Sequence, residues 1–324
     1  MNTRPPPLIE AHDIRKRFGN VQALDGVSVR FEPGSFHALL GENGAGKSTL
    51  VKCLMGFHAA DSGTIRVDGE PRAIPDPRAA HALGLGMVYQ HFTLVPSMTV
   101  AENLLLSRPD LAGLIHWRAE RRGIDAFLAR MPFSLDPDAP AMSLAAGEKQ
   151  KLEILKQLYL GVRVLILDEP TSVLTPQEAD EVLSHARRLA DAGLLTVVLI
   201  THKFREVRAH AREVSVLRGG RNAGGGPVAA LDTDVLVEMT FGARPPSDGA
   251  VRTERAAGGN YLELRKLSAL NDRGSLAVRD LSLHVASGEI VGVAGVSGNG
   301  QRELVEVLAG QREPESGDIA VAGR

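Results

Sequence analysis

Cysteine is almost absent from this 324-residue chain, in which Cys53 stands alone. A single thiol cannot form an internal disulfide, so a reducing compartment is the simplest expectation. The chain also lacks any run of about eighteen uninterrupted apolar residues, and its start, MNTRPPPLIEA, has no apolar stretch after the arginine. We therefore expect a chain that is neither exported nor membrane-spanning by itself.

An excess of charge of either sign is lacking as well. The chain has 37 Lys and Arg residues against 39 Asp and Glu residues, which gives a formal net charge of -2. This balance argues against a protein that coats nucleic acid by bulk electrostatics, so a charged ligand must be bound by local groups. The hydrophobic content of 44% allows a substantial core, and the length favours about two domains.

Short segments that are apolar on both faces predict parallel strands covered by helices on each side. Three segments have this character: residues 36–40, 164–167 and 195–200. Between them lie helical patterns, one of which opens at Thr175. This threonine can cap the helix, Pro176 suits its first turn, and Glu178 can complete a capping box. The expected fold class is α/β.

The sequence also contains a repeat. Residues 243–260 lose all apolar periodicity and are rich in Pro, Gly, Arg and Ala, so we interpret them as a linker. After them, residues 281–300 align with residues 27–46 at an offset of 254, which matches Gly295 with Gly41. We predict one complete domain in residues 1–242. Residues 261–324 are expected to hold only the opening strands and helix of a second copy, in a truncated chain or in a natural short form completed by another polypeptide.

A glycine-rich stretch in the first copy fits the P-loop pattern between an apolar strand and a helical run. Backbone N–H groups of such a loop wrap phosphate oxygens, Lys47 would reach the outer phosphates, and the Ser48 hydroxyl can ligate Mg²⁺. The strand–loop–helix context argues against a glycine-rich turn without function. The predicted nucleotide-binding residues are Gly41, Glu42, Asn43, Gly44, Ala45, Gly46, Lys47, Ser48 and Thr49.

A second apolar strand ends in two carboxylates, Asp168 and Glu169, where the carboxyl ends of a parallel sheet should meet the ligand. Asp168 suits the Mg²⁺ shell. Glu169 is the candidate general base that orients and deprotonates a water attacking the γ-phosphate. A strand that ends in Asp-Glu is often only a solvated strand end, but the P-loop in the same chain favours the functional interpretation.

The combination resembles the nucleotide-binding subunit of an ATP-binding cassette (ABC) transporter, over nearly the whole chain. The resemblance implies a P-loop NTPase with a mixed sheet flanked by helices, a helical subdomain that carries the signature motif, and ATP and Mg²⁺ as cofactors. In the family a glutamine follows a strand after the P-loop, and Gln90 in MVYQHF corresponds to it; a histidine ends a later strand, and His202 in VVLITHKF corresponds to it. An aromatic residue upstream stacks on adenine, which the resemblance assigns to Phe18 in KRFGN. The predicted catalytic residues are Lys47, Gln90, Glu169 and His202, and the predicted metal ligands are Ser48, Gln90 and Asp168.

The family signature, usually Leu-Ser-Gly-Gly-Gln, corresponds here to LAAGE at residues 144–148. The resemblance makes Gly147 a nucleotide-contacting residue, but Ala145 replaces the serine that would bond a partner's γ-phosphate. That loss should weaken this half-site about ten- to a hundred-fold.

The second P-loop-like stretch has Gln301 and Arg302 in place of lysine and a hydroxyl. In the family each site joins one domain's P-loop to the other domain's signature, so both departures fall in one composite site, which would bind nucleotide passively at best.

Fused twin domains of this kind resemble the energy-supplying subunits of importers for simple sugars and nucleosides, and several runs, among them QHFTLVPSMTVAENL, favour nucleosides. The implied mechanism is ATP-driven domain closure that moves a helix of a membrane permease. The implied partners are permease subunits, through them an extracytoplasmic solute-binding protein, and a second nucleotide-binding domain that completes the site. Segment 90–107 is expected to face the permease, and the implied location is cytoplasmic, on the inner face of the cell membrane.

Two other function classes compete with this interpretation. A soluble twin-cassette ATPase that acts on ribosomes or DNA usually needs a long charged helical arm or a basic surface, and the Pro/Gly-rich linker and near-neutral net charge favour neither. No nucleic-acid partner is therefore expected, although salt-sensitive RNA binding would support that class. A non-catalytic nucleotide-sensing fragment would show the same turnover as its Glu169→Gln variant while still binding ATP.

Overall fold

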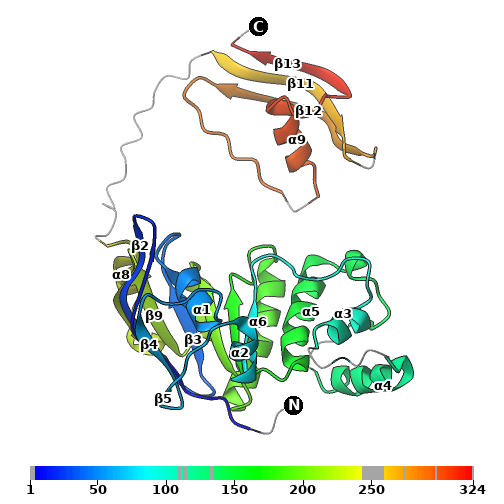
Figure 1. The fold of residues 1–324 in the computed structure, drawn as a ribbon. Helices are drawn as coiled ribbons and strands as arrows, with labels where there is room; N and C mark the ends of the chain where they lie inside the picture. Colours follow the sequence, from blue (N-terminus) through cyan, green and yellow to red (C-terminus); the bar gives the residue numbers. More distant parts are fainter. Residues whose placement is uncertain are drawn as a thin grey trace. The chain divides into compact units, whose positions relative to one another are not determined.

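The chain divides into two compact units, Met1–Pro245 and Pro246–Arg324. The structure, a computed structural model, describes residues 4–108, 111, 115–131, 135–242, 259–272, 274–295 and 298–322 (Figure 1). Among these described residues, no helix has the length and apolar character that crossing a membrane requires. Most of the predicted linker, residues 243–258, lies outside them.

A six-stranded sheet in the order β10-β9-β3-β8-β7-β6 forms the centre of the first unit. Its strands are β3 (Phe36–Leu40), β6 (Leu85–Val88), β7 (Val164–Asp168), β8 (Thr196–Thr201), β9 (Glu213–Arg218) and β10 (Arg221–Pro227). The strands β9, β3, β8, β7 and β6 run parallel to one another, and β10 is antiparallel to β9, so the sheet is mixed. The three predicted apolar strands are confirmed as β3, β7 and β8.

Successive side chains of β3 enter two different cores, because strand side chains alternate between faces. Phe36, Ala38 and Leu40 face a core shared with the helices on one side, whereas Leu39 faces a core shared with α1 (Lys47–Leu54) and a second sheet. This second sheet is antiparallel, in the order β2-β1-β4-β5. Its strands are β1 (Ile9–Phe18), β2 (Val21–Phe31), β4 (Ser62–Val67) and β5 (Glu70–Pro71).

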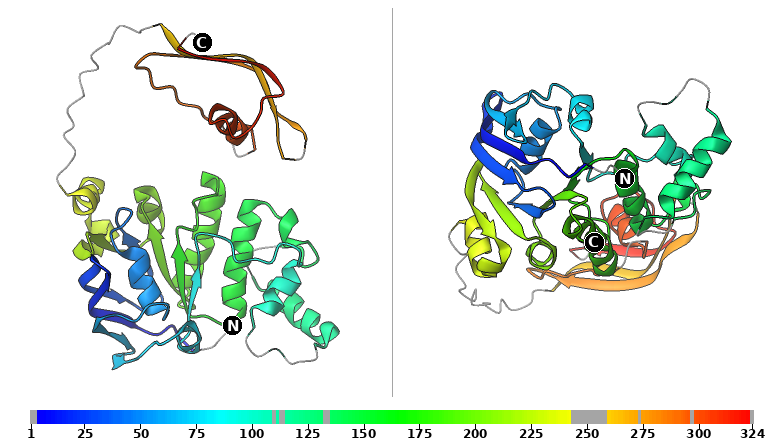
Figure 2. Two further views of the ribbon diagram at one scale, coloured as in Figure 1. Left: turned by 45° about the horizontal axis from the view of Figure 1, so that its top comes forward. Right: turned by 90° about the horizontal axis from the view of Figure 1, so that it is seen from below.

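Helices cover both faces of the central sheet and form a group at one side of it (Figures 1 and 2). They are α2 (Pro77–Ala82), α3 (Val100–Leu106), α4 (Trp117–Leu128), α5 (Ala146–Tyr159), α6 (Pro176–Asp191), α7 (Phe204–His210) and α8 (Thr233–Phe241), with 3-10 turns at Ala141–Ser143 and Val228–Ala230. The lateral group consists of α3, α4 and α5. Thr175 caps α6 and forms the predicted capping box with Glu178.

The second unit contains three strands and one helix within its described residues. The strands β11 (Asn260–Leu270), β12 (Leu276–Ala286) and β13 (Ser316–Val321) form an antiparallel sheet in the order β12-β11-β13. Helix α9 (Gln301–Leu308) contributes Leu304 and Val307 to a small core with Leu264 and Leu267 of β11. The predicted linker ended at residue 260, but Asn260 already belongs to β11.

Residues 289–295 of the second unit form no strand, although they align with the segment that contains β3. The strand β3 pairs with β8 on one side and β9 on the other. The described part of the second unit offers no equivalents of these two neighbours. The side chain of Ile290 is accordingly 97% exposed. An apolar segment becomes a strand only when neighbouring strands take its backbone hydrogen bonds.

Candidate nucleotide-binding site

A pocket of about 470 Å³ opens at the carboxyl ends of β3, β6 and β7. Parallel strands end at the same edge of a sheet, so segments far apart in the sequence meet there. The lining residues are Val21, Gln22, Ala23, Asn43, Gly44, Ala45, Gly46, Lys47, Ser48, Thr49, Gln90, Asp168 and Glu169. The structure therefore brings together most of the predicted P-loop residues, the glutamine and both carboxylates.

Backbone conformation fixes the start of α1 at this pocket. Gly46 caps the helix in the left-handed region with φ 101°, and a Cβ built there would lie 2.6 Å from the carbonyl oxygen of Ala23. Only glycine combines this conformation with so close an approach. The free N–H groups of the first turn of α1 are consequently presented at the pocket, where they can bind an anion.

Lys47 is held inside its own loop. Its side-chain Nζ donates to the carbonyl oxygens of Gly41 at 2.7 Å and Glu42 at 2.8 Å, and the residue is 6% exposed. Burial lowers the pKa of Lys47, while the nearby carboxylates of Glu169 and Asp168 act in the opposite direction. Gly41 and Glu42 thus position the ammonium group through their carbonyl oxygens and do not themselves line the pocket.

The two carboxylates at the end of β7 lie in different surroundings. Burial, followed by the charge of Glu169, raises the pKa of Asp168, whereas Lys47, Lys52 and a hydrogen bond from Ser48 act in the opposite direction. Glu169 has a left-handed backbone with φ 46°, which is uncommon outside glycine. This turn at Glu169 directs its side chain away from the line of β7, toward the end of the neighbouring strand.

His202 meets Glu169 at this point. The Nδ1 of His202 lies 3.1 Å from Oε1 of Glu169. The histidine follows β8, and β8 is the parallel neighbour of β7. His202 is not among the residues that line the pocket, so the structure brings it to the site through Glu169.

The predicted metal ligands offer the oxygen atoms that Mg²⁺ prefers. Ser48, Gln90 and Asp168 supply a hydroxyl, an amide and a carboxylate to the same pocket. No cluster of three or more His, Cys, Asp or Glu side chains that could hold a metal occurs among the described residues. The donor set therefore fits a magnesium ion that phosphate oxygens and water also ligate, and the assignment of these three residues stays a prediction.

Phe18 and Gly147 also lie outside the pocket lining. Phe18 is 43% exposed, and its ring packs edge-on against His58 with centroids 5.1 Å apart. Gly147 is buried in the first turn of α5, where a Cβ would lie 2.7 Å from Oε1 of Glu178. Their roles toward a nucleotide stay predictions. Conversely, residues 21–23 line the pocket and were not predicted, because they belong to no motif. They are the first residues of β2.

The signature region shows the consequence of Ala145. Its backbone N–H donates to Oε2 of Glu148 at 2.9 Å, but a methyl side chain cannot accept a bond in return. Ser143 does not replace the missing hydroxyl, since its Oγ donates to the carbonyl oxygen of Pro140 at 2.8 Å. The start of α5 is therefore only half capped.

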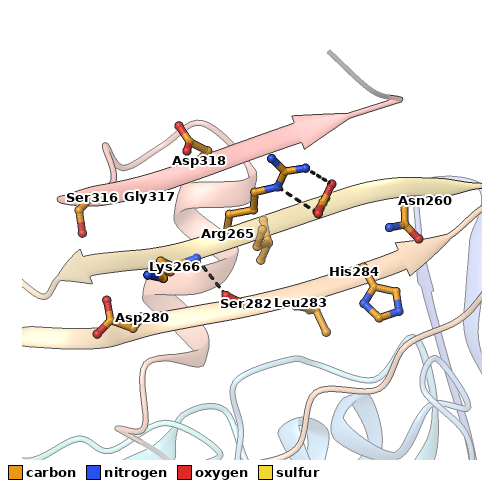
Figure 3. Close-up of a pocket in the computed structure, with 12 residues that line it drawn as sticks. Asn260, Arg265, Lys266, Asp280, Ser282, Leu283, His284, Ser316, Gly317 and Asp318 are labelled. Atoms are coloured by element: carbon orange, nitrogen blue, oxygen red, sulfur yellow. Dashed lines mark hydrogen bonds and ion pairs between the residues drawn. The ribbon is translucent and has the colours of Figure 1, made fainter.

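The second unit has a wider hollow of about 830 Å³ on its sheet (Figure 3). One pair of charged side chains in its lining is bonded: Arg265 Nη2 donates to Oε2 of Glu263 at 2.9 Å. The backbone N–H of Lys266 donates to Oγ of Ser282 at 3.0 Å. None of the predicted site residues lies there. In the P-loop-like stretch of this unit, a Cβ at Gly295 would collide with the amide group of Gln301.

Comparison with known proteins agrees with the geometry of the first unit. Residues 24–172 match the family described as ABC transporter. The glucose import ATP-binding protein TsgD13 of Haloferax volcanii is 41% identical over 98% of this chain and 63% of its own length. The nucleoside import ATP-binding protein NupA of Lactococcus lactis is 40% identical over 96% of this chain and 62% of its own length. The ribose import ATP-binding protein RbsA 1 of Rubrobacter xylanophilus is 43% identical, with coverages of 98% and 62%.

The chain thus spans less than two thirds of the length of these curated relatives. Among solved structures, a nucleotide-free ATP-binding cassette from an ABC transporter superposes with a TM-score of 0.62 at 26% identity, covering 72% of this chain and 98% of that one. Another ATP-binding cassette, in its ADP conformation, has the same TM-score and coverage at 25% identity. The first unit of this chain therefore has the fold of an ATP-binding cassette of the ABC transporter type, and the chain is homologous to the ATP-binding proteins of sugar and nucleoside import.

Proposed function

We propose that this chain is the ATP-hydrolysing, energy-coupling subunit of an ABC importer for nucleosides or simple sugars. The observation that carries the proposal is the convergence of Lys47, Asp168 and Glu169 on one pocket, with His202 in contact with Glu169. The printed names of the relatives, which are import ATP-binding proteins for glucose, nucleosides and ribose, support the class of cargo.

The roles of the side chains follow from their chemistry. Lys47 would neutralise the outer phosphates, and the N–H groups at the start of α1 would bind phosphate oxygens. Ser48, Gln90 and Asp168 would hold Mg²⁺, which supplies further positive charge when bound. Glu169 would orient a water and take its proton, and His202 would hold the Glu169 carboxylate in place.

The permease is the partner that this function requires. We infer that segment 90–107, which contains Gln90 and α3, faces permease subunits and through them serves an extracytoplasmic solute-binding protein. Such a chain would act at the inner face of the cell membrane. ATP binding would close two nucleotide-binding domains, and hydrolysis would reopen them.

We further propose that residues 1–242 are a complete cassette and that residues 261–324 open a second, degenerate copy joined by the linker. Left-handed glycines that recur at the offset of 254 support this: Gly34 and Gly288, Gly46 and Gly300, Gly56 and Gly310, and Gly63 and Gly317. Ala145 and the pair Gln301–Arg302 would then share one composite site that binds nucleotide weakly. The site around Lys47 would need the signature of a second domain.

Hydrolysis by wild-type chain and by Glu169→Gln tests the proposed function. With the permease present, the variant should bind Mg·ATP with unchanged affinity but release phosphate about a hundred-fold more slowly, because the general base is lost. The permease together with the wild-type chain should take up a labelled nucleoside or pentose, and the permease together with Glu169→Gln should not. Equal phosphate release by the two proteins would contradict the catalytic assignment.

A further inference from the structure

The loops that carry Glu169 and His202 are joined behind the site by one buried carboxylate. Glu206, in the first turn of α7, is 7% exposed. Its Oε1 accepts a hydrogen bond from the hydroxyl of Thr171 at 2.5 Å, and its Oε2 accepts one from the hydroxyl of Thr201 at 2.9 Å. Thr171 follows Glu169 by two residues, and Thr201 directly precedes His202. Each oxygen of Glu206 therefore binds one of the two loops.

Lys203 completes this cluster. Its Nζ donates to the carbonyl oxygen of Thr171 at 3.0 Å and to the hydroxyl at 2.9 Å, and it lies 3.3 Å from Oε1 of Glu206. Its backbone N–H donates to the hydroxyl of Thr201 at 3.1 Å. Thr171, Thr201 and Glu206 are 2%, 1% and 7% exposed, so the bonds between the two threonines and Glu206 are shielded from water, whereas 39% of the Lys203 side chain is exposed. Every charged or hydroxyl group of the cluster has a partner inside it.

We propose that Glu206 is a positioning residue, which sets the separation between the candidate base Glu169 and His202. The inference rests on the proposed function. The contact between the two side chains is 3.1 Å long, and each side chain lies within two residues of a threonine that Glu206 binds. Misplacement of a catalytic group by about 1 Å can cost about a hundred-fold in rate, so the connection between the two loops matters for activity.

A similar cluster of a buried glutamate, a lysine and one threonine elsewhere in this chain provides a control. Glu153 on α5 is 1% exposed and accepts a hydrogen bond from the hydroxyl of Thr93 at 3.0 Å. Lys156 Nζ lies 3.2 Å from Oε2 of Glu153 and donates to the Thr93 hydroxyl at 2.9 Å. Glu153→Gln thus removes a buried carboxylate without touching the loops of Glu169 and His202. Because Thr93 lies in segment 90–107, this control applies to the His202 signal and not to hydrolysis with the permease present.

The test of Glu206→Gln has two readouts, and Glu153→Gln is the control in the first of them. The first is the imidazole ¹⁵N signal of His202, assigned by its loss in His202→Gln. Glu206→Gln should move this signal toward its position in Glu169→Gln, whereas Glu153→Gln should leave it unchanged. The second readout is steady-state hydrolysis with the permease present, in which Glu206→Gln should lower kcat at least about tenfold and change KM less than about twofold.

Milder variants keep the test decisive where Glu206→Gln fails to fold. Thr171→Val and Thr201→Val each remove one hydroxyl at constant volume, and each should move the His202 signal in the same direction by a smaller amount. An unmoved His202 signal in both threonine variants would overturn the proposal, as would a signal that Glu153→Gln moves equally. The nitrogen signal needs no hydrolysis, so a wild-type chain without ATPase activity would count against the proposed function and leave the test of Glu206 intact.

Discussion

The Nδ1 of His202 lies 3.1 Å from Oε1 of Glu169, although the two residues are 33 positions apart in the sequence. Strand register explains the contact. Asp168 on β7 pairs with Ile200 on β8, and the backbone N–H of Glu169 donates to the carbonyl oxygen of Ile200 at 3.0 Å. The chain therefore assembles the candidate base and its neighbour from the ends of two adjacent parallel strands.

A charge on segment 90–107 should uncouple transport from nucleotide binding. Leu106 at the end of α3 is 52% exposed, which suits an apolar contact with a partner. Leu106→Glu should reduce nucleoside or pentose uptake at least about tenfold while Mg·ATP affinity changes less than about twofold, since burying an unpaired charge in a contact is costly. Leu194→Glu is the control, because Leu194 is 47% exposed and lies outside the segment. Unchanged uptake by Leu106→Glu would refute the assigned permease face.

Ala145→Ser should stabilise the domain. Ala145 is the N-cap residue of α5 in an extended conformation, with φ -64° and ψ 162°, and Glu148 already accepts its backbone N–H. A serine hydroxyl there can accept the N–H of Glu148 and complete the capping box, which is worth about 0.5–2 kcal/mol. Urea unfolding measures the gain. Ala146→Ser inside the first turn offers a control without a cap, and equal stability of the two variants would contradict the prediction.

Acid should destabilise the first unit through His37. This residue of β3 is 6% exposed, with Nε2 2.9 Å from the hydroxyl of Ser215, and burial lowers the pKa of His37 to about 4. Because burial lowers the folded-state pKa, the unfolded chain binds this proton more tightly, and the free energy of unfolding falls progressively as the pH drops from about 6.5 to about 4, on the order of 3 kcal/mol in total. Between pH 7 and 4.5, wild type should lose about 2 kcal/mol more unfolding free energy than His37→Gln in urea titrations. Parallel losses in both proteins would show that His37 is not the group responsible.

Much of the fold could be predicted because the relevant signals are local. The segments 36–40 and 164–167 are apolar on both faces, which suffices to predict covered parallel strands. Thr175 could be identified as a cap because capping depends on residues three positions apart. The pocket followed from these strands, since their carboxyl ends had to meet at one edge.

The rest depends on contacts between distant segments. Residues 21–23 line the pocket from the start of β2 and carry no motif. No spacing rule links Glu206 to Thr171, 35 residues away. Residues 289–295 show the converse case, because their apolar pattern predicts a strand by alignment with β3. An apolar pattern says nothing about which neighbouring strands will pair with the backbone of the segment. Among the described residues no neighbour pairs with residues 289–295, and these residues form no strand.

The measurement that tests the central claim most directly is the affinity of Lys47→Ala for Mg·ATP by calorimetry. Lys52→Ala is the matched control, since Lys52 is an exposed lysine on the same helix outside the pocket lining. A hydrogen bond to a charged oxygen is worth about 1.5–3 kcal/mol, so Lys47→Ala should bind about ten- to a hundred-fold more weakly than wild type, and Lys52→Ala within about twofold of it. Wild-type affinity in Lys47→Ala would contradict the assignment of this pocket to nucleotide binding.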